Sequence, residues 1–194
     1  MLLNHILLVV LWTIYFSLHS ILADNRVKGI IEDFAGIGFR FYRILYNLIA
    51  TIGLLFILIW NGYISTPYFY STNTFVLVVA LTITTIGLIV IKRSFREYKI
   101  SEFIGFKSTE NPDKILYTKG ILSKIRHPIY TGTILIILGF LIYRPNLTNL
   151  LSSLCAFIYL MIGIRLEEKR LLKEFGSSYK IYKERVPMLF PKFK

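Results

Sequence analysis

Residues 119–130 read KGILSKIRHPIY and join a basic polar loop to a long apolar run. Pro128 suits the first turn of a helix, where a missing backbone N–H costs little. We therefore expect a helix to begin here, with Arg126 and His127 at its N-terminus, near the positive end of the helix dipole. Free N–H groups at such a position favour an anionic ligand group. A polar helix cap with a long arginine side chain that reaches water is the alternative, and it stays open at this point.

The apolar residues on either side of this stretch occur in blocks. The chain has 194 residues, of which 55% are hydrophobic and 18% are charged, whereas soluble domains are nearer a quarter charged. A helix that spans a bilayer needs about 20 apolar residues. We predict an all-α, polytopic membrane protein with about five transmembrane helices, followed by a cytoplasmic, amphipathic C-terminal helix. The five predicted spans are residues 2–22, 42–61, 74–92, 128–143 and 146–164.

The charges predict how the chain crosses the membrane. The net charge is +12, and basic loops alternate with loops that carry almost no charge. This alternation fits the positive-inside rule for five spans, with the N-terminus outside and the third loop and the tail in the cytoplasm, facing anionic lipids. Such placement explains the excess of lysine and arginine without a nucleic-acid partner. The first apolar tract has no basic segment before it, so we interpret it as a retained helix and not a signal peptide.

Cys155, His19 and residues 23–41 each allow a structural interpretation. Cys155 is the only cysteine, which excludes an internal disulfide, and we expect it to pack as a small apolar residue. His19 lies in the first span, where it would either ligate haem or relay a proton, or form a hydrogen bond to a neighbouring helix. Residues 23–41 are interpreted as a short connection that lies on the membrane face.

The tail shows the spacing of a helix. Its apolar residues recur every three or four positions, Gly176 is expected to interrupt or kink the helix, and the sequence from Val186 to Pro191 is expected to end it. The link between the fourth and fifth spans is so short that these spans must form an antiparallel hairpin. The hairpin would bring four side chains to the same end of the membrane domain, namely His127, Tyr130, Arg165 and Glu167.

Two motifs now stand together. The first is Gly120-x5-Arg126-His127-Pro128-x-Tyr130-x-Gly132. The second begins Glu167-Glu168-x-x-Leu171 and continues through Phe175-Gly176-x-x-Tyr179-x-x-Tyr182 to Val186-Pro187 and Pro191. At this separation and on both sides of a helical hairpin, the pair resembles the isoprenylcysteine carboxyl methyltransferase family of integral membrane methyltransferases. The first half, with Leu18-His19-Ser20 and Tyr42-Arg43-x-x-Tyr46-Asn47, resembles the related NnrU and methanethiol S-methyltransferase branch.

The resemblance implies S-adenosylmethionine as the methyl donor and a pocket for it between the third loop, the start of the fourth span and the start of the tail. It implies cofactor-binding roles for Lys114, Ile115, Leu116, Tyr117, Leu122, His127, Pro128, Ile129, Tyr130 and Glu167. Leu122 stands where the family often has an aromatic residue. The resemblance also implies catalytic roles for His127 and for Arg165, which would approach the methyl acceptor. The chain would then be a single membrane domain, with three helices in residues 1–93 and a cofactor-binding half in residues 94–194.

We therefore predict a membrane-embedded methyltransferase that acts on a small thiol or on a lipophilic, isoprenylcysteine-like acceptor, in contact with membrane lipids. The expected location is a prokaryotic cell membrane. Two alternatives remain at this stage. One is a haem-binding isomerase or redox protein of the NnrU type, and the other is a membrane protein that binds lipid without catalysis. No residues in the sequence suggest a metal site.

Overall fold

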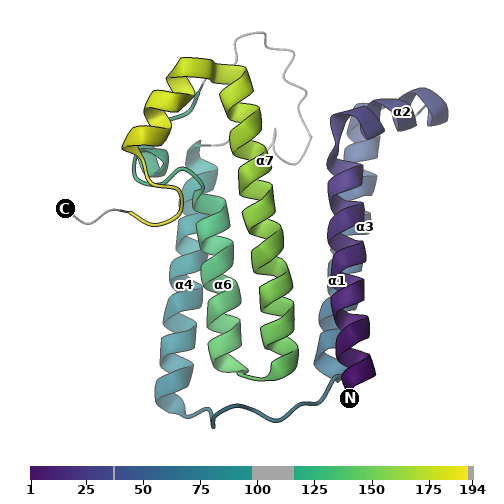
Figure 1. Cartoon of the computed structure of the whole chain (residues 1–194), viewed down its shortest axis with the longest axis vertical. Helices are drawn as coiled ribbons and strands as arrows, with labels where there is room; N and C mark the ends of the chain where they lie inside the picture. Colours follow the sequence, from purple (N-terminus) through teal and green to yellow (C-terminus); the bar gives the residue numbers. More distant parts are fainter. Residues whose placement is uncertain (37, 98–115, 192–194) are drawn as a thin grey trace. The chain divides into compact units, whose positions relative to one another are not determined.

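A computed structural model describes residues 1–36, 38–97 and 116–191, and every regular element of this described part is a helix (Figure 1). The described residues belong to two compact units. The first consists of residues 1–67 together with 146–156, and the second of the remaining residues from 68 to 191. Each unit is described separately below.

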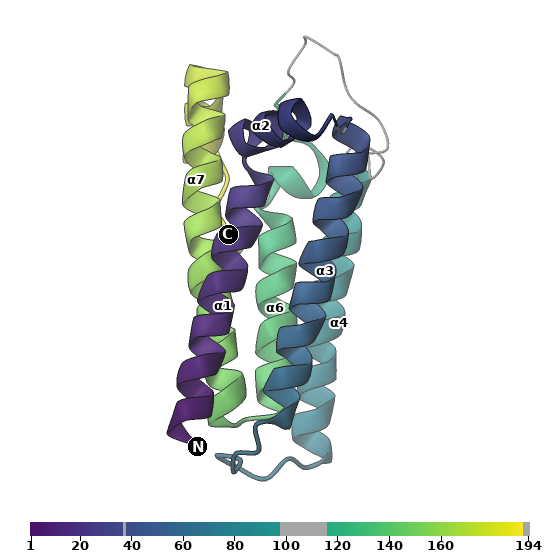
Figure 2. The ribbon, with the colours of Figure 1, turned by 90° about the vertical axis from the view of Figure 1, so that its right-hand side faces the viewer.

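The first unit is built on α1 (Leu2–Ala23) and α3 (Phe39–Tyr63), which run side by side (Figures 1 and 2). Its apolar core consists of Leu8, Trp12, Ile57 and Ile64. The first turns of α7 (Leu147–Arg185) join this unit through buried polar groups. Asn61 Nδ2 donates to Asn149 Oδ1 over 2.7 Å, and Trp12 Nε1 donates to the hydroxyl of Ser152 over 2.9 Å. Polar side chains inside a membrane have no water to bond, and such interhelical hydrogen bonds satisfy them instead.

The connection between α1 and α3 contains a helix that we did not predict. Residues Asn25–Ala35 form α2, which links the ends of α1 and α3 (Figure 2). The side chain of Asp24 caps it by accepting from the backbone N–H groups of Arg26 and Val27, and Gly36 ends it in the left-handed conformation, with φ 61°. Ile30 and Phe34, one turn apart, are 67% and 93% exposed. An exposed apolar face on a helix between two apolar helices is typical of a segment that lies in the membrane interface, and this location stays a prediction.

The second unit contains α4 (Thr74–Glu97), the 3-10 helix η1 (Gly120–Ser123), α6 (Pro128–Tyr143) and α7 from Phe157 onward. The link from Arg144 to Asn146 is short, so α6 and α7 form the predicted antiparallel hairpin (Figure 1). Glycines bring α4 and α6 close together. A Cβ atom on Gly87 would lie 2.7 Å from the carbonyl oxygen of Gly132, and one on Gly132 would lie 2.6 Å from the carbonyl oxygen of Gly87. Small residues at such a crossing permit close backbone packing.

Among the described residues, four helices are long and apolar enough to cross a membrane, namely Leu2–Ala23, Phe41–Tyr63, Thr74–Arg96 and Leu147–Arg185. This finding indicates a multi-pass membrane protein and agrees with four of the five predicted spans. The remaining one, α6, starts and ends as predicted but has only 16 residues. At 1.5 Å per residue it is about 24 Å long, shorter than the hydrocarbon core of about 30 Å. The count of five spans therefore stays a prediction.

The tail also follows the sequence analysis. Gly176 interrupts α7 with φ 52° and ψ −124°, a conformation that residues with a Cβ rarely adopt. Beyond this kink the helix ends at Arg185, directly before Val186 and Pro187. The kink turns the last part of α7 back toward the start of α6 (Figure 1).

The glycine contact generates a prediction about stability. Gly87→Ala places a methyl group against the Gly132 carbonyl, so α4 and α6 must separate, and overpacking of this kind costs about 1–3 kcal/mol. We expect a lower melting temperature of the purified protein in detergent. Gly62→Ala is the control, because nothing lies within 4 Å of a Cβ at that position and alanine favours the helix. Equal melting temperatures for the two variants would contradict the close approach of α4 and α6.

Candidate functional site

The N-terminus of α6 forms as the sequence predicts. Pro128 is the first residue of the helix and His127 is its N-cap. Both are buried, His127 to 3% exposure. The preceding turn, η1, is held by Tyr182, whose hydroxyl donates to the carbonyl oxygen of Leu122 over 2.7 Å. The tail of α7 therefore fixes the segment that leads into α6.

A buried ion pair joins the loop before α6 to α7. Arg126 donates to Glu168 Oε1 from Nε over 2.9 Å and from Nη2 over 2.6 Å, and the two side chains are 7% and 11% exposed. Lys183 Nζ lies 2.7 Å from Glu168 Oε2. We call Arg126, Glu168 and Lys183 the clamp. Glu168 lies before the Gly176 kink and Lys183 after it, so the clamp holds the fold of the tail as well as the hairpin.

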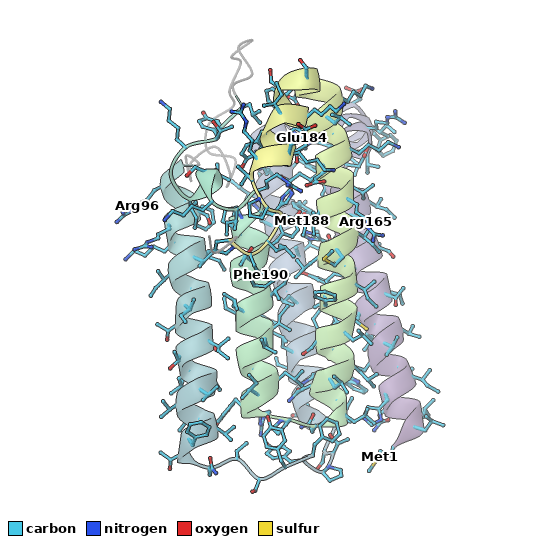
Figure 3. The ribbon with its side chains drawn as sticks, turned by 60° about the vertical axis from the view of Figure 1, so that its left-hand side comes forward. Met1, Arg96, Arg165, Glu184, Met188 and Phe190 are labelled. Atoms are coloured by element: carbon cyan, nitrogen blue, oxygen red, sulfur yellow. The ribbon has the colours of Figure 1, made fainter. Side chains whose placement is uncertain are left out.

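The C-terminal residues 186–189, here called the strap, cross the start of α6. The backbone N–H of Arg126 donates to the Pro187 carbonyl over 2.9 Å, and that of His127 donates to the Met188 carbonyl over 3.1 Å. The Thr131 hydroxyl donates to the Leu189 carbonyl over 2.7 Å. Figure 3 shows Met188 of the strap and, just beyond the strap, Phe190, near the N-terminal end of α6.

The strap reduces the number of free backbone N–H groups at the N-terminus of α6. We expected free N–H groups at this helix N-terminus, but those of Arg126 and His127 already have acceptors in the strap. Pro128 has no N–H to offer. Within the described part of the chain, the amides of Ile129 and Tyr130 remain as the donors of the first turn without an acceptor. The alternative with an arginine that reaches water is wrong, because the side chain of Arg126 is only 7% exposed. Anion binding at the two remaining amides stays a prediction.

His127 lies between two carboxylates. Its Nε2 is 3.3 Å from Glu168 Oε1, and its Nδ1 is 3.7 Å from Glu167 Oε2. The ring of Tyr130 meets the imidazole edge-on, with centroids 5.6 Å apart. The structure thus brings His127, Tyr130 and Glu167 together, as the hairpin argument predicted. The side chain of Glu167 is 31% exposed, against 11% for Glu168, so Glu167 is the more accessible of the two acids.

The electrostatics separate the two acids further. Burial alone would raise the pKa of Glu168, but hydrogen bonds from Lys183 and Arg126 outweigh it and lower the pKa to about 2. Burial would likewise raise the pKa of Glu167, and hydrogen bonds from His127 and Tyr130 lower it below its ordinary value. Both carboxylates are therefore ionised at neutral pH. Glu168 has its charge balanced by two cations, whereas the described partners of Glu167 are the imidazole of His127, the Tyr130 hydroxyl and the more distant Arg170.

The other residues that the sequence analysis assigned to the site have different positions. Lys114 and Ile115 lie outside the described residues. Leu116 packs against Tyr179, Tyr182 and Val186, and the neighbouring Tyr117 is exposed. The side chain of Leu122 is 2% exposed and faces the core, Ile129 is half-buried beside Pro128, and Arg165 is exposed on α7 (Figure 3). The roles of these residues stay predictions.

Two residues of this site had no role in the sequence analysis. Glu168 was recognised only as the neighbour of Glu167, and its contacts reach 42 residues back to Arg126. Tyr179 was noted only as part of the apolar face, yet its hydroxyl is buried and has no hydrogen-bond partner among the described residues. The twin-acid motif was the available signal for Glu168. No local pattern in the sequence distinguishes a tyrosine whose buried hydroxyl has a partner from one whose hydroxyl has none.

His19 lies in the first unit and has a defined partner. The Tyr46 hydroxyl lies 3.0 Å from Nδ1 and 3.1 Å from Nε2 of the His19 ring, and Tyr15 stacks on the same ring. This contact between α1 and α3 confirms the hydrogen bond that was one of our two interpretations. His5 is 14 residues earlier on α1, which places it about 21 Å away along the helix, too far to share one haem iron with His19.

The clamp generates a prediction about stability. Glu168→Gln leaves the guanidinium of Arg126 buried without its counter-charge, which costs about 3–5 kcal/mol. We expect a clear fall in melting temperature at pH 7. The pKa of Glu168 is lowered from 4.5 to about 2, so the stabilisation is complete above pH 4.5 and is lost as the pH falls toward 2. The difference between the wild type and the variant should therefore shrink over that range.

Glu184→Gln is the matched control, because this carboxylate is exposed on the same tail (Figure 3). It should leave the melting temperature almost unchanged. A Glu168→Gln variant as stable as Glu184→Gln would show that the clamp does not hold the tail.

Known proteins resemble this chain over much of its length. Methanethiol S-methyltransferase 1 of Bradyrhizobium diazoefficiens is 29% identical over 184 residues, which are 89% of this chain and 62% of that protein. Methanethiol S-methyltransferase 2 of the same organism is 33% identical over 92 residues, which are 46% of this chain and 34% of that protein. Protein-S-isoprenylcysteine O-methyltransferase of Schizosaccharomyces pombe is 36% identical over 85 residues, which are 43% of this chain and 36% of that protein.

The chain thus spans between about a third and three fifths of the length of these relatives. No solved structure matches it. A family model described as NnrU protein matches residues 6–189. Because this match covers nearly the whole sequence, the chain belongs to the NnrU family.

Proposed function

We propose that the chain is an S-adenosylmethionine-dependent methyltransferase of the membrane, which transfers a methyl group to a small thiol or to a lipophilic, isoprenylcysteine-like acceptor. The observation that carries the proposal is the accessible carboxylate of Glu167 beside His127 at the N-terminus of α6, next to a clamp that already neutralises Glu168. The names of the relatives support the reaction class.

The described residues fit the charges of the donor. An α-amino acid end carries an ammonium and a carboxylate, and Glu167 is the acid whose charge is not already paired with an arginine or a lysine at short range. We propose that Glu167 binds the ammonium. We propose that the amides of Ile129 and Tyr130 and the imidazole of His127 donate hydrogen bonds to the carboxylate of the donor. Glu168 is committed to the clamp and serves to position the tail.

His127 is better placed to orient a ligand than to remove a proton. Carboxylates lie near both of its ring nitrogens, which favours an imidazole that donates hydrogen bonds. We propose that His127 contacts the donor and holds Glu167 in place. For a thiol acceptor it is the nearest candidate base, although that role would require one nitrogen to lose its carboxylate partner.

Methyl transfer depends on alignment. S-Adenosylmethionine supplies an electrophilic methyl group on a sulfonium. The residues of the chain must hold the acceptor in line with it, and alignment of this kind provides roughly 7–11 kcal/mol of the barrier. We propose that Arg165, exposed on α7, approaches the acceptor, and that the residues around Leu116 and Tyr117 line the donor side together with Leu122 and Pro128.

The membrane setting follows the charge pattern. We propose that the N-terminus lies outside and that the clamp, the strap and the tail lie in the cytoplasm of a prokaryotic cell, where the donor is available. An apolar acceptor would enter from the lipid. The exposed Ile30 and Phe34 of α2 would rest among lipids at the membrane surface.

The direct experiment is a methyl-transfer assay with methyl-labelled S-adenosylmethionine on membranes that contain the chain, with methanethiol and a prenylcysteine analogue offered side by side. We expect label in one of the two acceptors above that of membranes without the protein. Transfer to neither, by protein that binds S-adenosylhomocysteine, would confine the chain to a binding role. Absorbance in the haem Soret region in the purified protein would instead support the haem-binding alternative.

Glu167 provides the sharpest variant for this proposal. Glu167→Gln keeps the shape of the side chain and removes its charge, so the ammonium loses its ionic partner. We expect S-adenosylhomocysteine to bind more than tenfold more weakly, as measured by isothermal titration calorimetry, because charge-assisted bonds contribute about 1.5–3 kcal/mol. The melting temperature should change far less than in Glu168→Gln. Unchanged affinity in Glu167→Gln would remove this residue from the site.

A further inference from the structure

The second unit contains a buried hydroxyl, that of Tyr179, to which the site described above assigns no role. Tyr179 is 1% exposed and packs with Tyr182 and Val186, yet its hydroxyl has no hydrogen-bond partner among the described residues. An unsatisfied buried donor costs about 1–3 kcal/mol. The hydroxyl of Tyr182, one turn along the same helix, does have a partner, because it donates to the carbonyl of Leu122 over 2.7 Å.

The position of Tyr179 relates this hydroxyl to the clamp. Lys183 lies four residues later, on the same face of the helix, and its ammonium contacts Glu168 over 2.7 Å. Burial and the nearby charge of Glu168 raise the pKa of Tyr179, which keeps the phenol protonated and therefore a donor. Glu168 already accepts hydrogen bonds from three other residues. One of its oxygens accepts from Arg126 and His127 and the other from Lys183, and no hydrogen bond of normal geometry joins it to Tyr179.

We propose that the Tyr179 hydroxyl is a ligand-binding group, which donates a hydrogen bond to the carboxylate of an α-amino acid end whose ammonium is held by Glu167. This inference rests on the proposed function and adds a residue to it. The ammonium and the carboxylate of an α-amino acid are attached to the same carbon, so the group that binds the second must adjoin the group that binds the first. Tyr179 is such a group, since it lies near both acids of the pair.

The charges of the site agree with a ligand that carries both signs. Arg126 and Lys183 bring two positive charges, and Glu167 and Glu168 bring two negative ones. A zwitterionic end leaves this balance unchanged. The ammonium of Lys183 is half exposed and uses one of its three protons on Glu168, so it can support the same carboxylate.

The test compares two ligands on two variants of the full chain in detergent. Isothermal titration calorimetry is run with S-adenosylhomocysteine and with its decarboxylated analogue, S-adenosyl-3-thiopropylamine, on wild type, Tyr179→Phe and Tyr182→Phe. Melting temperatures are measured without ligand. We expect Tyr179→Phe to weaken S-adenosylhomocysteine by about 10- to 100-fold and to leave the decarboxylated analogue unchanged. Its melting temperature should be equal to that of the wild type or higher, because only an unpaired hydroxyl is removed.

Tyr182→Phe is the matched control, since it removes a hydroxyl that has a structural partner. It should lower the melting temperature and keep the ratio of the two affinities. The inference is overturned if Tyr179→Phe leaves the ratio of the two affinities unchanged, whether it weakens both ligands equally or neither of them. If the wild type binds neither nucleoside, the proposed function fails and this inference fails with it. If the wild type binds S-adenosylhomocysteine and Tyr179→Phe binds it equally well, only the role of Tyr179 is lost.

Discussion

The ion pair between Arg126 and Glu168 is the interaction on which the arrangement of the site depends. Both side chains are buried, and the guanidinium also donates to the carbonyl oxygens of Lys183 and Val186. One arginine therefore joins the loop before α6, the middle of α7 and the end of the tail. A charge in such a place is stable only while its partners remain, so the cost of separating the three segments is high. The geometry of His127 and Glu167 follows from this restraint, because both neighbour members of the pair.

The neighbouring acids have different tasks for a physical reason. Glu168 has two cations at 2.6–2.7 Å, which neutralise its charge. Glu167 has an imidazole at 3.7 Å and a more exposed side chain. An acid that is already neutralised maintains structure, and one that is ionised without a close cation attracts one. Successive residues of a helix point about 100° apart, so a pair of adjacent acids can place one carboxylate in the protein and present the other.

Local signals in the sequence were sufficient for much of the fold. Pro128 fixed the start of α6, Gly176 the kink, and Val186 with Pro187 the end of the tail, because each acts through its own backbone. The helix α2 was missed although Asp24 is a good N-cap, since the mixed charges and glycines of that loop obscured the apolar face. The contacts of the strap with the start of α6, and those of Glu168 with Arg126 and His127, join residues 41 to 61 positions apart, and no local pattern reports them. The sequence identified the motif residues of the site, but the structure was needed to separate the acid that holds the tail from the one that is accessible.

The central claim is that a nucleoside donor binds where α6 begins and α7 carries its two acids. Photo-cross-linking of labelled S-adenosylmethionine to the purified chain, followed by mass spectrometry of the labelled peptides, tests it most directly. The account predicts label in peptides that contain residues 126–130 or 165–183, and loss of that label when unlabelled S-adenosylhomocysteine is added in excess. Label confined to residues 1–67, or label that the competitor does not reduce, would contradict it.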